Sequence, residues 1–526
     1  NYFKNLLEKD KAENIEIIQS TEIEKFPYLK NIAKALVTIN GIIESLPDEE
    51  LKSFGNFIYT RVKLIKNTTP QKIDLNKLFS TINSAGVQLE QTDIVKANLL
   101  KSIDEKVLFS KIWESCENMN NFFERNVRDS FPKTDFAKVD LSKFNEFNQT
   151  VFIFEDTNEH NTTKEISSSI FTIDDLQPEN CDPYNESQKV VFDESRQSED
   201  IFCRSIINFA QLLLHTYRLH LRGEGLPDFE GTFHANRLIE IFKPLEERNN
   251  PEEIKRFLKL LWKVRFLFDK YIVKWVSDVE TKTEQLELVN INKNSDNNYT
   301  RTRYAKSSML MLQSVLYFTG DYLRQFWLTS YLGYLADFHE NSEPNSDTLL
   351  TRLEKIDNDL SLCKTITDKD ASLALIDTDI DLSFDFEEYL HSGIGTKYQH
   401  YWFQKMEYVL WKNWSFQKTD EFGNYRIVSR NSIEHIYPQN PENIIKNPKI
   451  DDEHLHSFGN LVLLSVSQNS EYSNKSVDEK RSKFIHKNNT YDTLKSYFIF
   501  QKPRWTTTEI GQHKIDMIDK LKVHYK

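Results

Sequence analysis

Two short apolar runs near the C-terminus, separated by a polar loop, constrain the fold of this chain more than any other stretch. The first run, from Ser432 to Ile436, contains His435 and is followed by a proline at position 438. The second run opens on Asn460 and continues through four apolar residues. Short apolar runs bounded by turn residues are typical of strands, and a polar, basic segment follows the second one. The pattern predicts strand, loop, strand and helix over residues 431–485.

The polar residues of this pattern fit the hydrolysis of a phosphodiester, which needs a base, a hard divalent cation and a geometry that holds both. His435 suits the base, because an unperturbed histidine has a pKa of about 6.5. Asn469 offers an amide oxygen, a ligand type that Mg²⁺ and Mn²⁺ prefer. Asn460 is placed to hydrogen-bond across the loop and hold the histidine strand. We therefore assign catalytic roles to His435 and Asn460, and a metal-binding role to Asn469.

Glu434 is a second candidate metal ligand, with a structural carboxylate as the alternative. Adjacent strand residues point to opposite faces, so Glu434 and His435 share a site only if the backbone turns there. Pro438 indicates that the strand ends soon afterwards. We interpret His454 and His456 as solvated loop residues. Candidate phosphate contacts, for which a solvated charged helix face is the alternative, are Asn474, Lys475, Lys480 and Arg481.

The same residues resemble the HNH nuclease domain at the C-terminus of GmrSD-type modification-dependent restriction proteins. The matching segments are Ile433 to Gln439, Gly459 to Leu464, Asn469, the pair Ser473 and Asn474, and Lys480. Asn469 lies nine positions after Asn460, the offset expected between the orienting and the metal-binding asparagine of an HNH module. The tail from Trp505 to Ile510 resembles the closing helix of the family. The resemblance implies a metal-dependent endonuclease that serves defence against phage or other foreign DNA.

A second stretch, residues 78–100, reads as an apolar segment, a glycine turn and a helix capped by Thr92 or Asp93. It resembles the second half of the ParB/sulfiredoxin-like domain that precedes the HNH domain in the same family. The resemblance implies a remnant of a nucleotide pocket at Asn83, Gly86, Asp93 and Lys96. The alternative is that Gly86 only forms a turn and Asp93 only caps a helix.

The Asp-Gly-Gln-Gln-Arg motif that this family associates with nucleotides does not occur in the chain, which opens on Asn1. We therefore expect the chain to be the remainder of a longer protein, with any NTP requirement residing in the missing upstream part. The β-rich half of the N-terminal domain would then be missing as well. From this we expect residues 1–104 not to fold independently.

Composition sets the fold class. At 526 residues the chain is too long for one core, and 36 Phe and 22 Tyr against 13 Gly and 14 Pro favour long helices. The net charge of −13 excludes a generally basic coat but not a local basic surface. Four scattered cysteines without a CxxC pair suggest neither zinc nor disulfides, which fits a reducing cytoplasm. The sequence shows neither a membrane-spanning run nor a signal peptide.

The middle of the chain carries no catalytic motif. Apolar residues at helical spacing predict helices in the segments 108–126, 201–222, 253–276, 307–337 and 347–362. Residues 145–200 are polar and predict a loop or a β-rich insertion. Residues 396–414 predict an apolar helix that braces the nuclease domain against the helical body, with base stacking by Trp411 or Trp414 as an alternative role.

The sequence thus predicts a mainly α multidomain protein with a C-terminal α+β HNH (ββα-metal) nuclease domain. The expected domains are 1–104 (the C-terminal part of a ParB/sulfiredoxin-like NTPase/sensor domain), 105–395 (a helical middle region with a polar insertion near 145–200) and 396–526 (the HNH endonuclease domain). The expected cofactor is Mg²⁺ or Mn²⁺. The expected partners are DNA, including modified phage DNA, and a second copy or a partner defence protein, with no membrane. Two alternatives stay open: a sensor or adaptor that does not cleave, and an RNase-type toxin.

Overall fold

The computed structural model describes residues 38–61 except 40, 42 and 44, then residues 90–154 and 203–277, and most of 283–526, with gaps at 296–297, 304–305, 321–323, 339–344, 443, 446–447 and 486–489. Contacts divide the chain into two compact units, Asn1–Gln88 and Leu89–Lys526. In the first unit, helix α5 (Asp48–Arg61) has no buried residue. The predicted turn at Asn83 and Gly86, Cys181 and most of the polar stretch 145–200 lie outside the described residues.

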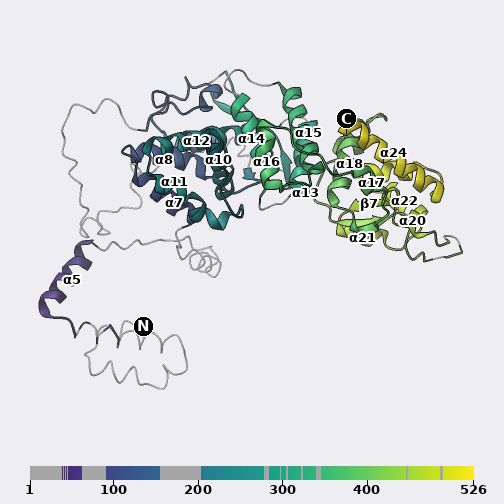
Figure 1. Ribbon diagram of the computed structural model, residues 1–526, viewed down its shortest axis with the longest axis horizontal. Coiled ribbons are helices and arrows are strands. Elements are labelled where there is room, and N and C mark those ends of the chain that lie inside the picture. Colours follow the sequence, from purple (N-terminus) through teal and green to yellow (C-terminus); the bar gives the residue numbers. More distant parts are fainter. Residues whose placement is uncertain are drawn as a thin grey trace, which may run out of the picture. The chain divides into compact units, whose positions relative to one another are not determined.

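The second unit is mainly helical (Figure 1). Its α-helices are α7 (Gln91–Lys101), α8 (Lys106–Glu117), α9 (Phe123–Ser130), α10 (Phe209–Gly223), α11 (Leu238–Arg248), α12 (Pro251–Tyr271), α13 (Ser308–Thr319), α14 (Trp327–Phe338), α15 (Ser346–Leu362), α16 (Asp368–Asp377), α17 (Phe386–His391), α18 (His400–Lys412), α19 (Asp420–Asn424), α20 (Asp452–Leu455), α21 (Val466–Tyr472), α22 (Val477–Ile485), α23 (Leu494–Phe500) and α24 (Thr507–Tyr525). Short 3₁₀ turns are η1 (Leu141–Phe144), η6 (Ala235–Arg237), η7 (Gly395–Lys397) and η8 (Phe458–Asn460).

The strands form three small antiparallel sheets. The first has the order β1-β2-β3, and the other two are the pairs β4-β5 and β6-β7. The strands are β1 (Cys203–Ser205), β2 (Lys274–Ser277), β3 (Glu284–Glu287), β4 (Val289–Lys293), β5 (Tyr299–Arg303), β6 (Ser432–His435) and β7 (Leu461–Leu464). No helix among the described residues is long and apolar enough to cross a membrane.

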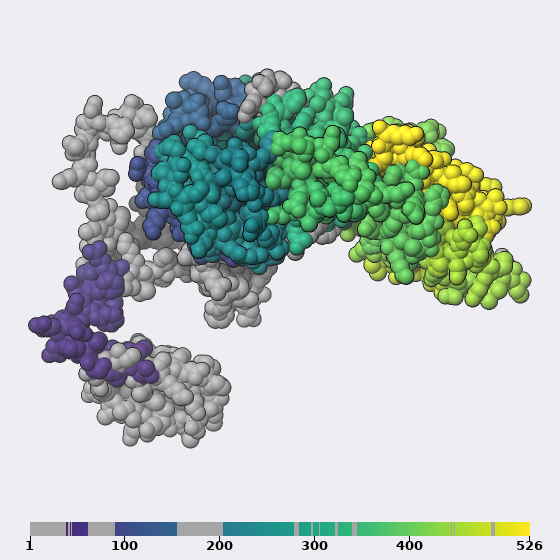
Figure 2. Space-filling view, in the orientation of Figure 1, coloured from purple at the N-terminus to yellow at the C-terminus, as the bar shows by residue number. Residues whose placement is uncertain are grey.

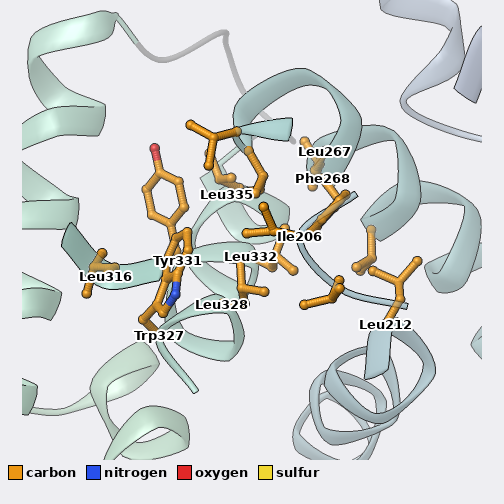
Figure 3. Close-up of a cluster of buried hydrophobic side chains, with 14 of the residues drawn as sticks. Ile206, Leu212, Leu267, Phe268, Leu316, Trp327, Leu328, Tyr331, Leu332 and Leu335 are labelled. Atoms are coloured by element: carbon orange, nitrogen blue, oxygen red, sulfur yellow. The ribbon is translucent and has the colours of Figure 1, made fainter. Parts of the chain in front are cut away.

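The helical body forms around α12, whose apolar residues recur at helical spacing. Asn250 caps this helix by accepting from two backbone N–H groups, and Pro251 occupies its first turn. Phe257, Leu261 and Val264 are fully buried along its length. Helices α10, α8 and α14 pack on it. The packed side chains of α14, with Leu267 and Phe268 of α12 and Ile206, are drawn in Figure 3.

The predicted helices of the middle region are confirmed, with interruptions that periodicity did not show. Residues 118–122 separate α8 from α9 within the segment 108–126, and the segment 253–276 ends in strand β2. The segment 307–337 is two helices, because α13 ends at Gly320, where a Cβ would lie 2.5 Å from the carbonyl oxygen of Leu316. The segment 201–222 begins as strand β1 before α10 starts.

Helix α7 differs from the prediction in two ways. Its cap is Glu90, which forms a capping box with Asp93, so Thr92 is not the cap. The helix also packs against α8 and α11. It therefore lies in the same compact unit as the middle region, rather than on the other side of a boundary near residue 104.

Helix α18, predicted as a brace, is buried along most of its length and packs on α13, α23, α24 and β7. Inside this junction, Lys405 forms a fully buried ion pair with Asp357 of α15. Glu407 accepts hydrogen bonds from the backbone N–H groups of Leu494 (2.6 Å) and Lys495 (3.1 Å) at the start of α23. Figure 2 shows the yellow C-terminal residues at the surface, where they lie against the green residues that precede them in the sequence. One helix thus joins the helical body to the C-terminal residues.

Trp411 and Trp414, the candidates for base stacking, stack instead on protein rings. Phe422 lies parallel to both, at ring-centroid distances of 6.1 Å and 4.8 Å. Tyr497 and Phe498 complete the cluster around Trp414. These contacts assign the two tryptophans to packing.

The docking of α24 on the brace should depend on pH through His524. Its ring packs edge-on against Tyr408 at 5.8 Å, and burial, with the nearby charges of Lys405 and Lys412, lowers its pKa from 6.5 to about 3. The unfolded chain therefore binds a proton that the folded chain does not, so this contribution to stability is lost as pH falls below about 6.5.

We predict that His524→Phe, which keeps the ring packing, removes this dependence. Between about pH 7.5 and 4.5, the stability of the wild type relative to the variant should fall by up to about 1.4 kcal/mol per pH unit. Denaturant unfolding of both proteins at each pH measures this difference in the free energy of unfolding. Parallel stability curves would contradict the assignment.

Candidate active site

The C-terminal motif folds as the predicted strand, loop, strand and helix, with the short helix α20 in the loop, and its two strands pair antiparallel. Ser432 pairs with Leu464, Glu434 with Val462, and His435 with Leu461. Residues directly opposite each other in such a pair share a face. Val462 and Leu464 belong to a core cluster with side chains of α21 and α22, whereas Leu461 and Leu463 belong to the main core. The face of Glu434 is therefore turned to α21 and α22, and the face of His435 to the brace side.

His435 is the last residue of β6 and is 5% exposed. Its Nε2 lies 3.1 Å from Nδ1 of His456, and the two rings are nearly perpendicular. Among the residues that the structure describes, its Nδ1 has no hydrogen-bond partner. Burial, with the nearby His456 and the charge of Lys480, lowers the pKa of His435 to about 4. The ring is therefore neutral at pH 7 and holds a lone pair ready to accept a proton.

On the other face, Lys480 of α22 reaches the end of the strand. Its Nζ donates to Oε1 of Glu434 (2.7 Å) and to the carbonyl oxygen of His435 (2.6 Å). The lysine side chain is fully buried and that of Glu434 is 13% exposed. Burial raises the pKa of Glu434 and lowers that of Lys480, and the opposite charge of each partner offsets part of the shift. The pair joins Glu434 to the backbone of the candidate base.

Asn460 is fully buried, and every polar group of its amide is used. Its Oδ1 accepts from the backbone N–H of Tyr437 (2.8 Å) and from Nε1 of Trp505 (3.1 Å). Its Nδ2 donates to the carbonyls of Tyr437 (3.2 Å) and Leu455 (2.9 Å). The amide thus ties both ends of the loop to the closing segment, and it orients the histidine strand without facing solvent.

Asn469 lies in the first turn after β7, in α21, and its Nδ2 donates to Oγ of Ser432 at 2.6 Å. Ser432 and Glu434 share one face of β6 because strand side chains alternate. Asn469 and Glu434 therefore lie on the same side of the ribbon, and the ring of His435 lies on the other. This differs from the expectation that His435 and Asn469 face one cleft. The two sides meet only at the end of β6, where Lys480 contacts both residues 434 and 435.

The chemistry of these donors fits Mg²⁺ or Mn²⁺, which bind through one or two carboxylates and complete their shell with water and substrate phosphates. Glu434 and Asn469 supply a carboxylate and an amide oxygen on one face. No cluster of three or more His, Cys, Asp or Glu side chains suited to a metal occurs among the described residues. A cation at Glu434 would share the carboxylate with the ammonium group of Lys480.

The candidate phosphate contacts divide into exposed and engaged side chains. Asn474 is exposed. Lys475 donates to the carbonyl of Glu471 (2.5 Å), and Arg481 to the carbonyl of Lys502 (2.8 Å). Lys480 differs most from the prediction, because its buried ammonium is satisfied inside the site and is not on a solvated helix face.

The predicted remnant of a nucleotide pocket is represented by two described residues. Asp93 accepts from the backbone N–H of Glu90, which is the capping role given as the alternative. Lys96 forms an ion pair with Glu114 at 3.3 Å. The positions 83 and 86 lie outside the described residues.

His456 is the site residue that the sequence interpretation missed. A histidine in a polar loop resembles its exposed neighbours, and the ring of His454 does lie against the carboxylate of Asp451 (2.7 Å). The difference between the two arises from the turn of α20, which directs position 456 inward toward the end of β6. Spacing in the sequence carries no signal for that turn.

Residues 384–520 match a family model described as the C-terminal domain of GmrSD restriction endonucleases. The matched range begins just before α17 and ends within α24, so it encloses the brace helix, the ribbon and the helices that cover it. No curated protein and no solved structure gave a significant match to the chain.

The role of Asn460 predicts a large loss of stability on truncation. Asn460→Ala leaves two N–H donors and two carbonyl acceptors of its partners without that side chain, and a buried unsatisfied polar group costs about 1–3 kcal/mol. We expect the free energy of unfolding to fall by more than about 2 kcal/mol in denaturant titrations. The matched control is Asn440→Ala at an exposed position of the same loop, which should change stability by less than about 0.5 kcal/mol. Equal effects of the two variants would refute the role.

Proposed function

We propose, from the premise that residues 384–520 belong to the C-terminal domain family of the GmrSD restriction endonucleases, that this chain hydrolyses phosphodiester bonds of DNA at the end of strand β6. The observation that carries the proposal is the neutral imidazole of His435 at that strand end, where Lys480 bonds both the carboxylate of Glu434 on the opposite face and the carbonyl oxygen of His435. Metal-dependent hydrolysis of a phosphodiester requires a base for water and a divalent cation held by oxygen ligands, and His435 and Glu434 are the candidates for these two roles.

In the proposed mechanism, Nδ1 of His435 takes a proton from a water molecule. The water oxygen forms the new bond to phosphorus, the P–O bond to the leaving sugar breaks, and the leaving alkoxide takes a proton from solvent. A bound phosphate brings negative charge close to the ring, which raises the basicity of His435 above its value in the DNA-free protein. The amide network of Asn460 holds the strand end in place while this happens.

Glu434 and Asn469 would hold Mg²⁺ or Mn²⁺ in this site. The ion, when bound, stabilises the negative charge that develops on the phosphate. Lys480 keeps the carboxylate of Glu434 oriented and neutralised in the DNA-free protein, since its ammonium group touches both that carboxylate and the strand end. The lysine thereby lowers the cost of burying the carboxylate before substrate arrives.

DNA is the proposed substrate because the matching family consists of restriction endonucleases. The same membership supports a role in defence against phage or other foreign DNA, with recognition of a modification in the upstream residues. We also propose that a nucleotide-sensing N-terminal domain licenses cleavage. The chain would act as a homo-oligomer or together with a partner defence protein.

The catalytic test is His435→Ala in the full chain, with duplex DNA and Mg²⁺ or Mn²⁺. Loss of a general base costs about 10² to 10⁴ in rate, and we expect the cleavage rate to fall by that factor while binding to DNA, measured by fluorescence anisotropy, is unchanged. Parallel reactions with RNA distinguish a DNase from an RNase. Cleavage at the wild-type rate by His435→Ala would remove the nuclease assignment from this site.

Glu434 requires a paired design, because its removal leaves the ammonium of Lys480 buried and uncompensated. Glu434→Gln alone should lower stability by about 3–5 kcal/mol, the usual cost of breaking a buried pair. The double variant Glu434→Gln, Lys480→Met should recover stability but not cleavage. Recovery of both would show that Glu434 is only a structural carboxylate.

For Asn469→Ala, partial restoration of the rate by excess Mn²⁺ would support the role of Asn469 as a metal ligand, and a rate independent of metal concentration would contradict that role.

A further inference from the structure

We propose that His456 is the positioning partner of the base, and that the turn at Gly395 fixes the ring of His456. This inference rests on the proposed function, since it assumes that His435 is the base. It adds a residue outside the motif, and a structural element that precedes the brace helix.

The first observation is the contact between the two rings. Nε2 of His435 and Nδ1 of His456 are 3.1 Å apart, with the ring planes at 75°. A hydrogen bond between two imidazoles needs one N–H and one lone pair, so the tautomer of one ring dictates that of the other.

The consequence for the base follows from that pairing. When Nδ1 of His456 accepts, His435 carries its proton on Nε2 and keeps the lone pair on Nδ1, where it can take a proton from water. In the reverse arrangement Nδ1 of His435 is protonated and cannot act as a base. An acceptor at position 456 therefore selects the active tautomer, and it remains hydrogen-bonded to the imidazolium that forms. A carbonyl or carboxylate oxygen fixes the tautomer of metal-binding histidines in other proteins in the same way.

The second observation is that the backbone of His456 is held from two sides. Its N–H donates to the carbonyl of Asp452 (2.9 Å), and this hydrogen bond closes the C-terminal end of α20. Its carbonyl accepts from the N–H of Gly395 (3.0 Å) in the turn before α18. These two bonds fix the backbone at position 456, and therefore the point from which the ring reaches His435.

Gly395 also limits the ring itself. It has a φ of +63°, a conformation that L side chains rarely adopt, and a Cβ built there would lie 2.8 Å from Nδ1 of His456. That nitrogen is the atom that bonds His435. The turn is anchored by Tyr398, whose hydroxyl accepts from the N–H of Gly393 and donates to the carbonyl of Leu390, both at 3.0 Å. The absence of a side chain at position 395 leaves the space in which the His456 ring meets the base.

The experiment measures kcat and KM for cleavage of duplex DNA by the full chain with Mg²⁺. His456→Ala should lower kcat by about 10- to 100-fold, the usual effect of removing an orienting partner, with KM within about twofold of the wild type. His456→Asn should restore most of the rate, because its Oδ1 stands close to where Nδ1 stood and accepts the same hydrogen bond. His454→Ala is the matched control, a histidine of the same loop that does not contact His435, and it should cleave like the wild type.

Gly395→Ala tests the second half of the inference. It should lower kcat as His456→Ala does, and the double variant should lose no more than either single variant, since both act through the same ring. Additive losses would overturn the role of the turn. Thermal unfolding of each variant separates these effects from misfolding.

The outcomes distinguish this inference from the function on which it rests. If His456→Ala cleaves at the wild-type rate while His435→Ala, assayed separately, is inactive, the positioning role is overturned and the function is left intact. So would a His456→Asn rate as low as that of His456→Ala, because then the acceptor at position 456 is not what matters. Wild-type cleavage by His435→Ala would remove the function itself.

Discussion

The candidate site depends on one buried amide. Asn460 makes four hydrogen bonds from its side chain and accepts one more, from the N–H of Ile436 (2.9 Å), at its backbone carbonyl. Together these bonds close the loop between the two strands over the tryptophan of the final segment. A group with two donors and two acceptor sites, all filled, allows one arrangement of its neighbours. The residues that it bonds, Tyr437 and Leu455, lie close in sequence to His435 at the end of β6 and to His456 at the end of α20.

Buried charges then join the site to the rest of the second unit. Lys480 holds the strand end, and Lys495 of α23 donates to the carbonyl of Leu461 (2.6 Å) and lies 3.8 Å from the ring centroid of Phe458. In the brace helix, Glu407 accepts from the N-terminal backbone of α23, and Lys405 forms an ion pair with the carboxylate of Asp357. Such groups cost desolvation energy and contribute specificity where each has its partner. Lys495 thus bonds both Glu407 of the brace helix and Leu461 of the ribbon that packs on it.

The sequence predicted the parts of this arrangement that local pattern controls. The two strands, the brace helix and the helices of the middle region follow from apolar spacing. The sequence did not predict the contacts between residues that lie far apart along the chain. Lys480 was predicted to contact phosphate, with a solvated helix face as the alternative, and it lies buried beside Glu434, 46 positions away. His456 was expected in solvent and meets His435 because α20 turns it inward. The alternation of β6 raised the question of whether Glu434 and His435 share a side, and only the packing of α21 and α22 against one face of the ribbon answers it.

The measurement that tests the central claim most directly is the crystal structure of the His435→Ala chain bound to duplex DNA. The account predicts a backbone phosphate at the end of β6, with an ordered water between it and the space left by the imidazole, at about 3 Å from each. It also predicts that Lys480 stays near residue 435 while the carboxylate of Glu434 turns to the phosphate or to a bound cation. A duplex seated elsewhere on the chain, with no phosphate within reach of Glu434 and His456, would contradict it.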